Sequence, residues 1–214
     1  MSALVRHHYQ DIIDEMAGLN WSILTRTELM AVAGAYYYYS VHFCETVDIA
    51  CDLYPWDRQL LKLREGECET DNLSPYPGVA EVGERMNHDE FMRRVFAMSS
   101  LDMAERERVE RLGLEYLAEV RRIHPVTRVR SLPTYEDGGL EKVFRAILFA
   151  PDWDEPSLRA FHHFLVGHIR LDSDPEGGHG SLCRHLVADD SVLPLWRAFR
   201  NLVVGAAPRL ASPA

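Results

Sequence analysis

Helical periodicity is the feature that most constrains the fold of this chain. Apolar residues recur at the spacing of an α-helix over nearly the whole sequence, and no segment alternates apolar and polar residues as a half-buried strand does. The clearest helix follows Thr25 and Glu28, which have the spacing of a capping box, and runs from Leu29 to about Leu53. It is apolar around its circumference, which is typical of a central, buried helix. We therefore predict an all-α fold.

The other periodic segments predict a bundle of about seven or eight helices in total, separated by proline and glycine residues. We find no repeat of fixed period and no long linker, so the 214 residues are expected to form a single domain, 1–214, with its core at about 25–206. Besides the central helix, the expected helices span about residues 3–18, 79–98, 101–123, 133–150, 156–172, 179–188 and 193–205.

Composition and charge exclude several classes of protein. Hydrophobic residues make up 47% of the chain and charged residues 26%, as in ordinary globular proteins. The net charge of -10 disfavours nucleic acid and anionic membranes as partners. No apolar run reaches the roughly 18 residues that a membrane span needs, and the N-terminus lacks the layout of a signal peptide. We expect a cytoplasmic protein.

The cysteine pattern and the absence of common motifs narrow the chemistry. Cys44, Cys51, Cys68 and Cys183 form no C-x-x-C pair, so we expect buried thiols in a reducing compartment and no thiolate zinc site. The chain has no G-x-x-x-x-G-K-[ST], no G-x-G-x-x-G and no G-x-S-x-G. Readings as a nucleotide-binding protein or a serine hydrolase therefore have no motif behind them.

Histidine and acidic residues recur at helical spacing in separate segments of a chain that contains 10 His and 33 Asp and Glu. Glu81 and His88 are seven residues apart, so on a helix they project within about 20° of each other, and Glu84 shares their face. His168 and Asp172 are four residues apart and lie one turn apart on one face. Neutral imidazole is the commonest metal ligand, so these pairs are candidate metal ligands.

A third segment and a last histidine extend the series. Glu136 and Glu141 are five residues apart, about 140° around a helix, so at most one of them points at a given centre. His179 follows seven residues after Asp172. Each pair arises easily by chance, but their ordered occurrence on separate helices favours a metal site. Imidazole and carboxylate without thiolate select iron or manganese over Cu(I) and leave zinc open.

This order of residues resembles the heme-oxygenase-like diiron oxidases and oxygenases. The motifs are Glu81-x6-His88, Thr134-Tyr-Glu-Asp137, and Phe164-Leu-Val-Gly-His-Ile-Arg-Leu-Asp172 followed by Gly178-His-Gly-Ser-Leu182, and the pattern covers about residues 30–205. The resemblance implies a heme-oxygenase-like helical bundle with two Fe(II) ions per chain, O2 as co-substrate, and chemistry at the metals rather than at a protein side chain. The six metal ligands that it implies are Glu81, His88, Glu136, His168, Asp172 and His179.

One spacing departs from the family pattern. The last histidine usually follows the aspartate by three or four residues, whereas Asp172 and His179 are seven apart, and Pro175 and two glycines between them disfavour an unbroken helix. Either His179 enters from the start of the next segment, or the second metal site is incomplete.

The resemblance implies an O2-dependent oxidoreductase that acts on a small metabolite, with pocket walls around 36–51 and 144–164. N-oxygenation of an amine is common in the family that the chain resembles, and we favour this reaction, in specialised metabolism; an acidic protein also attracts a cationic substrate. Oxidative desaturation or C–C cleavage of an amino or fatty acid is the alternative at the same site. An external electron donor could serve the reaction, and base rates favour a homodimer.

Three other readings stay open at this point. A metal-free enzyme of the thiaminase or pyrroloquinoline-quinone-synthase type would use the Cys44-Glu45 pair. A heme oxygenase would need an axial histidine near the N-terminus, where His7 and His8 lie. A non-catalytic helical binding protein would scatter its acids and histidines over the surface.

Overall fold

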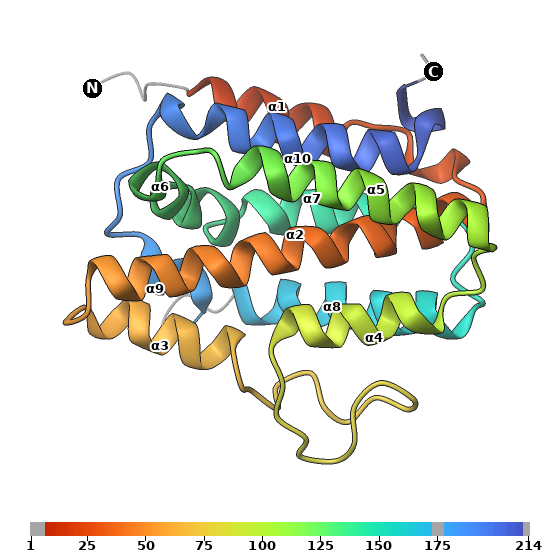
Figure 1. The fold of residues 1–214 in the computed structure, drawn as a ribbon, viewed down its shortest axis with the longest axis horizontal. Helices are drawn as coiled ribbons and strands as arrows, with labels where there is room; N and C mark the ends of the chain where they lie inside the picture. The colour runs from red at the N-terminus through yellow and green to blue at the C-terminus, as the bar shows by residue number, and fades with distance from the viewer. Residues whose placement is uncertain (1–6, 173–177, 212–214) are drawn as a thin grey trace.

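The computed structural model describes residues 7–172 and 178–211. Over these residues the chain forms ten α-helices and no β-strand, which confirms the all-α class (Figure 1). None of the described helices combines the length and the apolar character that a membrane span requires. The helices are α1 (His8–Ala17), α2 (Arg26–Leu53), α3 (Arg58–Glu67), α4 (His88–Met98), α5 (Met103–Val120), α6 (Pro125–Glu136), α7 (Gly139–Ile147), α8 (Pro156–Asp172), α9 (His179–Cys183) and α10 (Leu193–Ala206).

Helix α2 is the central element, as the sequence predicts. Its N-terminus is the expected capping box: the Glu28 backbone N–H donates to Thr25 Oγ1 at 3.2 Å, and the Thr25 N–H donates to Glu28 Oε2 at 3.1 Å. The helix crosses the middle of the molecule, with α5 and α10 on one side and α3, α4 and α8 on the other (Figure 1). Because neighbours cover it on several sides, apolar residues around its whole circumference are buried.

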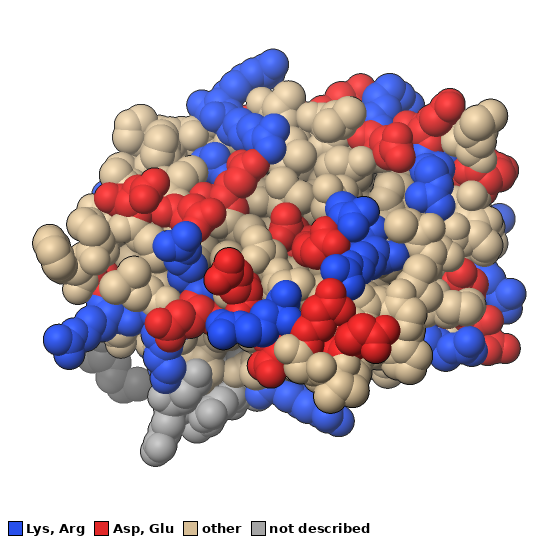
Figure 2. All heavy atoms as spheres, turned by 60° about the horizontal axis from the view of Figure 1, so that its bottom comes forward, with Lys and Arg blue, Asp and Glu red and all other residues tan. Residues whose placement is uncertain are grey.

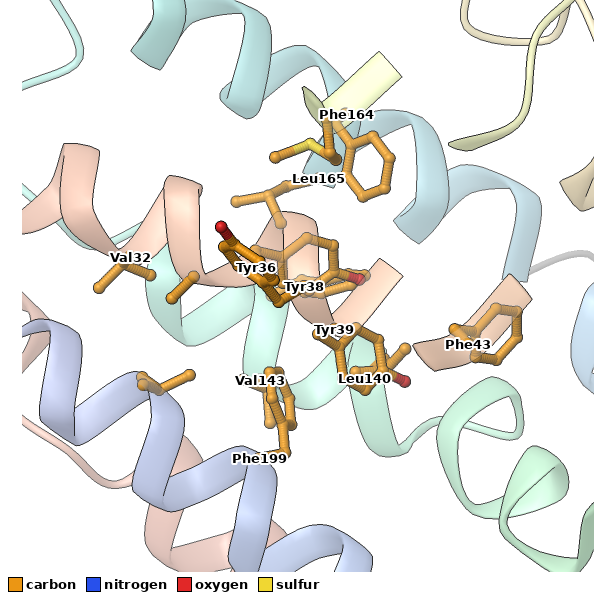
Figure 3. Close-up of a cluster of buried hydrophobic side chains, with 14 of the residues drawn as sticks. Val32, Tyr36, Tyr38, Tyr39, Phe43, Leu140, Val143, Phe164, Leu165 and Phe199 are labelled. Carbon is orange, nitrogen blue, oxygen red and sulfur yellow. The ribbon is translucent and has the colours of Figure 1, made fainter. Parts of the chain in front are cut away.

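Aromatic side chains fill the space around the middle of α2. The tyrosine run that begins at Tyr36 is part of the core: Tyr36, Tyr38 and Tyr39 are buried. Figure 3 shows Tyr36 and Tyr39 pointing among apolar side chains from the neighbouring helices. The Tyr39 ring centroid lies 4.2 Å from that of Phe199 on α10. Such pairs stabilise the core beyond the area that they bury, so this tyrosine run packs the bundle.

The described residues form ten helices where seven or eight are expected, and the helix expected over 179–188 ends at Cys183. Two further differences change the site. Residues 79–87 are not helical: α4 begins only at His88, after an irregular segment with Gly78 and Gly83 at φ of 79° and 70°. Those angles suit glycine and interrupt a right-handed helix. In addition, α3 is a helix that the periodicity did not reveal. Its N-cap is Asp57, and it buries only a narrow apolar stripe.

The expected helix 133–150 is in fact the end of one helix and the whole of the next. Pro125 stands in the first turn of α6, where its missing N–H costs no hydrogen bond. Helix α6 ends at Glu136, and Gly138 then adopts a φ of 92° before α7 begins. Gly138 therefore stands between two helices where the periodicity predicts one.

His42 on α2 predicts an acid-sensitive stability. It is fully buried, and its Nδ1 lies 2.8 Å from Tyr116 Oη. Burial, with the Arg128 and Arg121 guanidinium groups, lowers its pKa to about 3. Below pH 6.5 the unfolded chain therefore binds a proton that the folded chain does not, so the free energy of unfolding decreases as the pH is lowered. Between pH 7 and pH 5 this term costs about 2 kcal/mol of unfolding free energy.

The test compares urea denaturation at pH 7 and pH 5 for the parent chain and for His42→Asn. Asparagine keeps a polar group near the Nδ1 position but does not titrate, so the pH-dependent loss of the variant should be smaller by about 2 kcal/mol. An equal loss in both proteins would contradict the assignment to His42.

Candidate metal centre

Five ionisable side chains meet in the interior of the bundle. They come from five different helices, α3, α4, α6, α8 and α9. Each is nearly inaccessible: the exposed fraction of Glu67, His88, Glu136, His168 and His179 lies between 2% and 5%. Acidic side chains are almost never buried this completely unless they are paired or coordinate a metal. The cluster is therefore the main candidate for a functional site.

Helix ends position four of the five. Glu67 is the last residue of α3 and Glu136 the last of α6, whereas His88 and His179 are the first residues of α4 and α9. Only His168 lies inside a helix, on α8. The side chains are thus placed by the turns that begin and end helices, while the helices behind them keep them rigid. This explains why the positions of these residues depend on capping and glycine chemistry rather than on periodicity alone.

The first group of candidate ligands consists of Glu67, His88 and His168. His88 Nδ1 lies 2.6 Å from Glu67 Oε2 and 3.0 Å from His168 Nε2. Two ligand atoms at right angles around an ion, each about 2.1 Å from it, are about 3.0 Å apart. The nitrogen–nitrogen distance is that of a hydrogen bond and is also compatible with both nitrogens binding one divalent ion.

The second group consists of Glu67, Glu136 and His179. His179 Nδ1 lies 2.7 Å from Glu67 Oε1 and 3.4 Å from Glu136 Oε2. Glu67 thus offers one carboxylate oxygen to each group, Oε2 to the first and Oε1 to the second. Both groups are of the kind that could hold a metal ion, and a carboxylate shared in this way is suited to bridge two ions.

Hydrogen bonding around the cluster fits a metal better than a closed polar network. His168 Nδ1 donates to the Phe164 carbonyl at 3.0 Å, so in the neutral ring the lone pair is on Nε2, which faces the cluster. Glu67 Oε1 and Glu136 Oε2 are buried, and their nearest partner among the described residues is the same atom, His179 Nδ1, at 2.7 and 3.4 Å. Two buried carboxylates that share one imidazole nitrogen are costly to keep charged, and a divalent cation would balance them.

The charges of the cluster are strongly coupled. Burial alone would raise the pKa of Glu67, but the His88 and His179 rings outweigh it and hold the pKa well below its usual value. Burial raises the pKa of Glu136. Burial and the neighbouring His88 lower the pKa of His168 to about 3. For His179, burial is outweighed by Glu67 and Glu136, which raise its pKa well above the usual value.

These shifts describe how the cluster is balanced without an ion. A proton on His179 offsets the negative charge of Glu67 and Glu136, while His168 remains neutral. Metal ligands must be deprotonated, so a divalent cation would take the place of that proton. The donor set, two carboxylates and three imidazoles, is thus chemically prepared for one or two divalent ions.

A small cavity adjoins the cluster on the side of α2. Tyr36, Tyr39, Phe43 and Cys44 of α2 line it together with Phe164 of α8. The expected wall around 36–51 contributes four of these residues, and the expected wall around 144–164 contributes Phe164 alone. The volume of the cavity is about 10 Å³ for the centre of a water-sized sphere, which is room for about one water molecule. A metabolite needs side chains to move before it can enter.

Three acids proposed from the sequence lie outside the cluster. Glu81 is exposed in the irregular segment before α4, where its backbone N–H donates to Glu84 Oε2 at 2.9 Å. Glu84 pairs with Arg94 at 2.8 Å, and Glu141 pairs with Arg145 at 2.6 Å. The expectation that Glu81 faces the same centre as His88 is wrong, because it assumed a helix that is not there.

The question about the last ligands is partly answered. Asp172 is the final residue of α8, and its side chain lies outside the described residues. His179 is the first residue of α9 and is part of the cluster. Of the two alternatives left open by the spacing, entry of His179 from the start of the next segment is therefore the one that the structure has.

Sequence reasoning missed Glu67 entirely. A signal was present, however: Leu60, Leu63 and Glu67 lie at i, i+3 and i+7, so an acid continues the apolar stripe of α3. An acidic residue on a buried stripe is rare without a partner. The segment escaped notice because only two apolar residues of its ten are buried.

On the face shown in Figure 2, the described residues form no patch of a single charge. Figure 2 shows acidic and basic side chains interspersed over the face that carries the segment between α3 and α4.

Comparisons of the chain with protein-family models, with curated proteins and with solved structures found no match.

Proposed function

We propose that this chain is an O2-dependent, non-heme di-iron oxidoreductase that acts on a small metabolite. The observation that carries the proposal is the sharing of Glu67 between two buried groups of three candidate ligands. A single structural ion would need only one such group. The resemblance of the sequence motifs to the heme-oxygenase-like diiron enzymes supports the same reading for His88, Glu136, His168 and His179.

The donor set favours iron or manganese. All five side chains offer imidazole nitrogen or carboxylate oxygen, and no thiolate belongs to either group. Glu67, His88 and His168 would hold one Fe(II) ion, and Glu67, Glu136 and His179 the other. When bound, the ions supply the electrons and the Lewis acidity that O2 chemistry requires. The chain itself holds the ligands on rigid helix ends and keeps bulk water out of the site.

For the substrate we propose an amine that undergoes N-oxygenation, with oxidative desaturation or C–C cleavage of an amino or fatty acid as the alternative. The net charge of -10 favours a cationic amine over an anionic substrate. The cavity beside the cluster suits a molecule of the size of water or O2. The amine would therefore bind where movement of the cavity wall lets it approach.

The described residues give less support to the three competing functions. Cys44 is buried, but Glu45 forms ion pairs with Arg121 and Arg128, so the two do not form a catalytic pair. His7 lies 3.6 Å from Asp190 on the outside of the bundle, which disfavours a role as axial heme ligand. A non-catalytic binding protein predicts acids and histidines scattered over the surface, whereas five of them converge in the core.

Anaerobic Fe(II) titration of the metal-free protein tests the proposal. We expect uptake of about two ions per chain and, on exposure to O2, a transient visible absorption band. His168→Ala should retain about one ion, because it removes a ligand of the first group only. His163→Ala on the same helix, which touches the Leu73 carbonyl instead, is the matched control and should bind as the parent does. Absence of iron uptake by the folded parent would refute the proposal.

A further inference from the structure

Asn72 connects two of the candidate ligands. It lies in the irregular segment that leads from Glu67, at the end of α3, to His88, at the start of α4. Its Nδ2 donates to the Gly66 carbonyl at 2.9 Å. Its Oδ1 lies 2.9 Å from His88 Nε2. One amide therefore spans from the residue before Glu67 to the imidazole of His88.

The orientation of this amide follows from its partners. The Gly66 carbonyl can only accept, so the group that faces it must be the NH2 of Asn72. The oxygen of Asn72 then faces His88 Nε2 and can only accept, so Nε2 must carry a proton. The opposite orientation would place the Asn72 oxygen against the Gly66 carbonyl oxygen, two acceptors with no proton between them. The network thus assigns the proton of His88 to the outer nitrogen.

The consequence lies on the other side of the ring. In the metal-bound ring Nε2 keeps its proton, so the lone pair of His88 is on Nδ1, which lies 2.6 Å from Glu67 Oε2 and 3.0 Å from His168 Nε2. Without an ion, Nδ1 shares a proton with that carboxylate, and a metal ion takes the place of this proton. His168 is fixed in the opposite sense, because its Nδ1 donates to the Phe164 carbonyl. Two lone pairs and a carboxylate oxygen therefore converge on one point.

The same amide also steadies the rest of the cluster. Gly66 precedes Glu67, which both ligand groups share. A Cβ atom on Gly66 would lie 2.7 Å from His179 Nε2, so the end of α3 is packed directly against the second group as well. Asn72 holds this end of α3 through the Gly66 carbonyl.

We propose that Asn72 is a positioning residue that directs His88 to bind metal through Nδ1, while His168 binds through Nε2. This inference rests on the proposed metal site and names the ligating atoms within it. Residues that hold the far nitrogen of a metal-binding histidine typically change metal affinity by about 10- to 100-fold when removed. An effect of that size is expected here for the ion held by His88.

The test uses Zn2+, which is diamagnetic, and three variants of the full chain. Asn72→Ala removes both contacts and should weaken binding of one Zn2+ by about 10- to 100-fold. Asn72→Asp keeps an acceptor for His88 Nε2 but loses the donor to the Gly66 carbonyl, so its Zn2+ affinity should lie between those of Asn72→Ala and the parent. Ser74→Ala is the matched control, since it removes one hydrogen bond to Asp71 in the same segment and should bind Zn2+ normally.

Histidine side-chain nitrogen chemical shifts supply the second measurement. In the metal-free parent, His88 Nε2 should be protonated, and on Zn2+ binding the large shift should occur at Nδ1. An unprotonated Nε2, or unchanged Zn2+ affinity in Asn72→Ala, would overturn the inference. If the parent binds no Zn2+ at all, the metal site itself fails, while the Nε2 assignment in the metal-free protein still decides whether Asn72 sets the ring. If Asn72→Ala does not fold, the Zn2+ affinity of Asn72→Asp and the histidine nitrogen shifts of the parent still decide the inference.

Discussion

Replacing Glu67 with glutamine is expected to abolish binding of both metal ions, not of one. The two groups of candidate ligands have no other member in common, and each receives a different oxygen of this carboxylate, Oε2 toward His88 and Oε1 toward His179. Glutamine has nearly the same shape but lacks the charge and offers one oxygen instead of two. We expect each ion to bind more than about 100-fold more weakly, a larger loss than removal of an outer partner causes.

The number of ions bound per chain distinguishes a carboxylate that both groups share from one that serves a single group. Glu136→Gln alters the second group alone, so it should leave about one ion per chain, whereas Glu67→Gln should leave none. Glu65→Gln is the matched control, because Glu65 is exposed on the same helix and should leave both ions in place. Helical content measured by circular dichroism shows whether each variant is folded. Retention of one tightly bound ion by folded Glu67→Gln would show that the carboxylate does not bridge.

Gly139→Ala is expected to be the most damaging single-methyl change near the site. A Cβ at this position would lie 1.9 Å from the Thr134 carbonyl oxygen and 3.1 Å from Trp196 Cζ2. The first of these atoms belongs to the backbone of α6 and cannot turn away. Overpacking of this kind costs up to about 3 kcal/mol, and relief of the clash requires α6 and α7 to separate. Because Glu136 is the last residue of α6, metal binding should weaken as well.

The neighbouring glycine provides the control. Gly138 has a φ of 92°, but a Cβ there meets nothing within 4 Å. Gly138→Ala therefore suffers only the backbone strain of a left-handed residue, about 1 to 2 kcal/mol. Urea denaturation of both variants measures the difference in unfolding free energy. The steric explanation is wrong if Gly139→Ala is no less stable than Gly138→Ala.

The parts of the fold that could be predicted are those with a local cause. The Thr25–Glu28 capping box fixed the start of α2, and Pro156 in the first turn of its segment fixed the start of α8. The apolar character around the whole circumference of residues 29–53 then predicted that this helix is central. Such signals depend on residues within one or two turns of each other, so no knowledge of the tertiary structure was needed.

The candidate site was only partly predictable, because its geometry is set by helix ends. His88 and His168 were singled out by their place in an ordered series of ligand-type residues, and the structure brings them together. The partner on their side, however, is Glu67 and not Glu81, since the chain folds back through twenty residues that are not helical. Angles around an imagined helix have no meaning across such a segment. Contacts between residues far apart in the chain decide the ligand set.

The placement of the cluster also links metal supply to the persistence of the fold. Five helices each contribute one side chain to it, so bound ions would join segments that are otherwise held by apolar packing. A ligand that binds only the folded state at 100 times its dissociation constant adds about 2.7 kcal/mol to the stability. A loss of that size raises the unfolded fraction about 100-fold and exposes the chain to proteolysis. Metal scarcity would then lower the amount of this protein, and not only its activity.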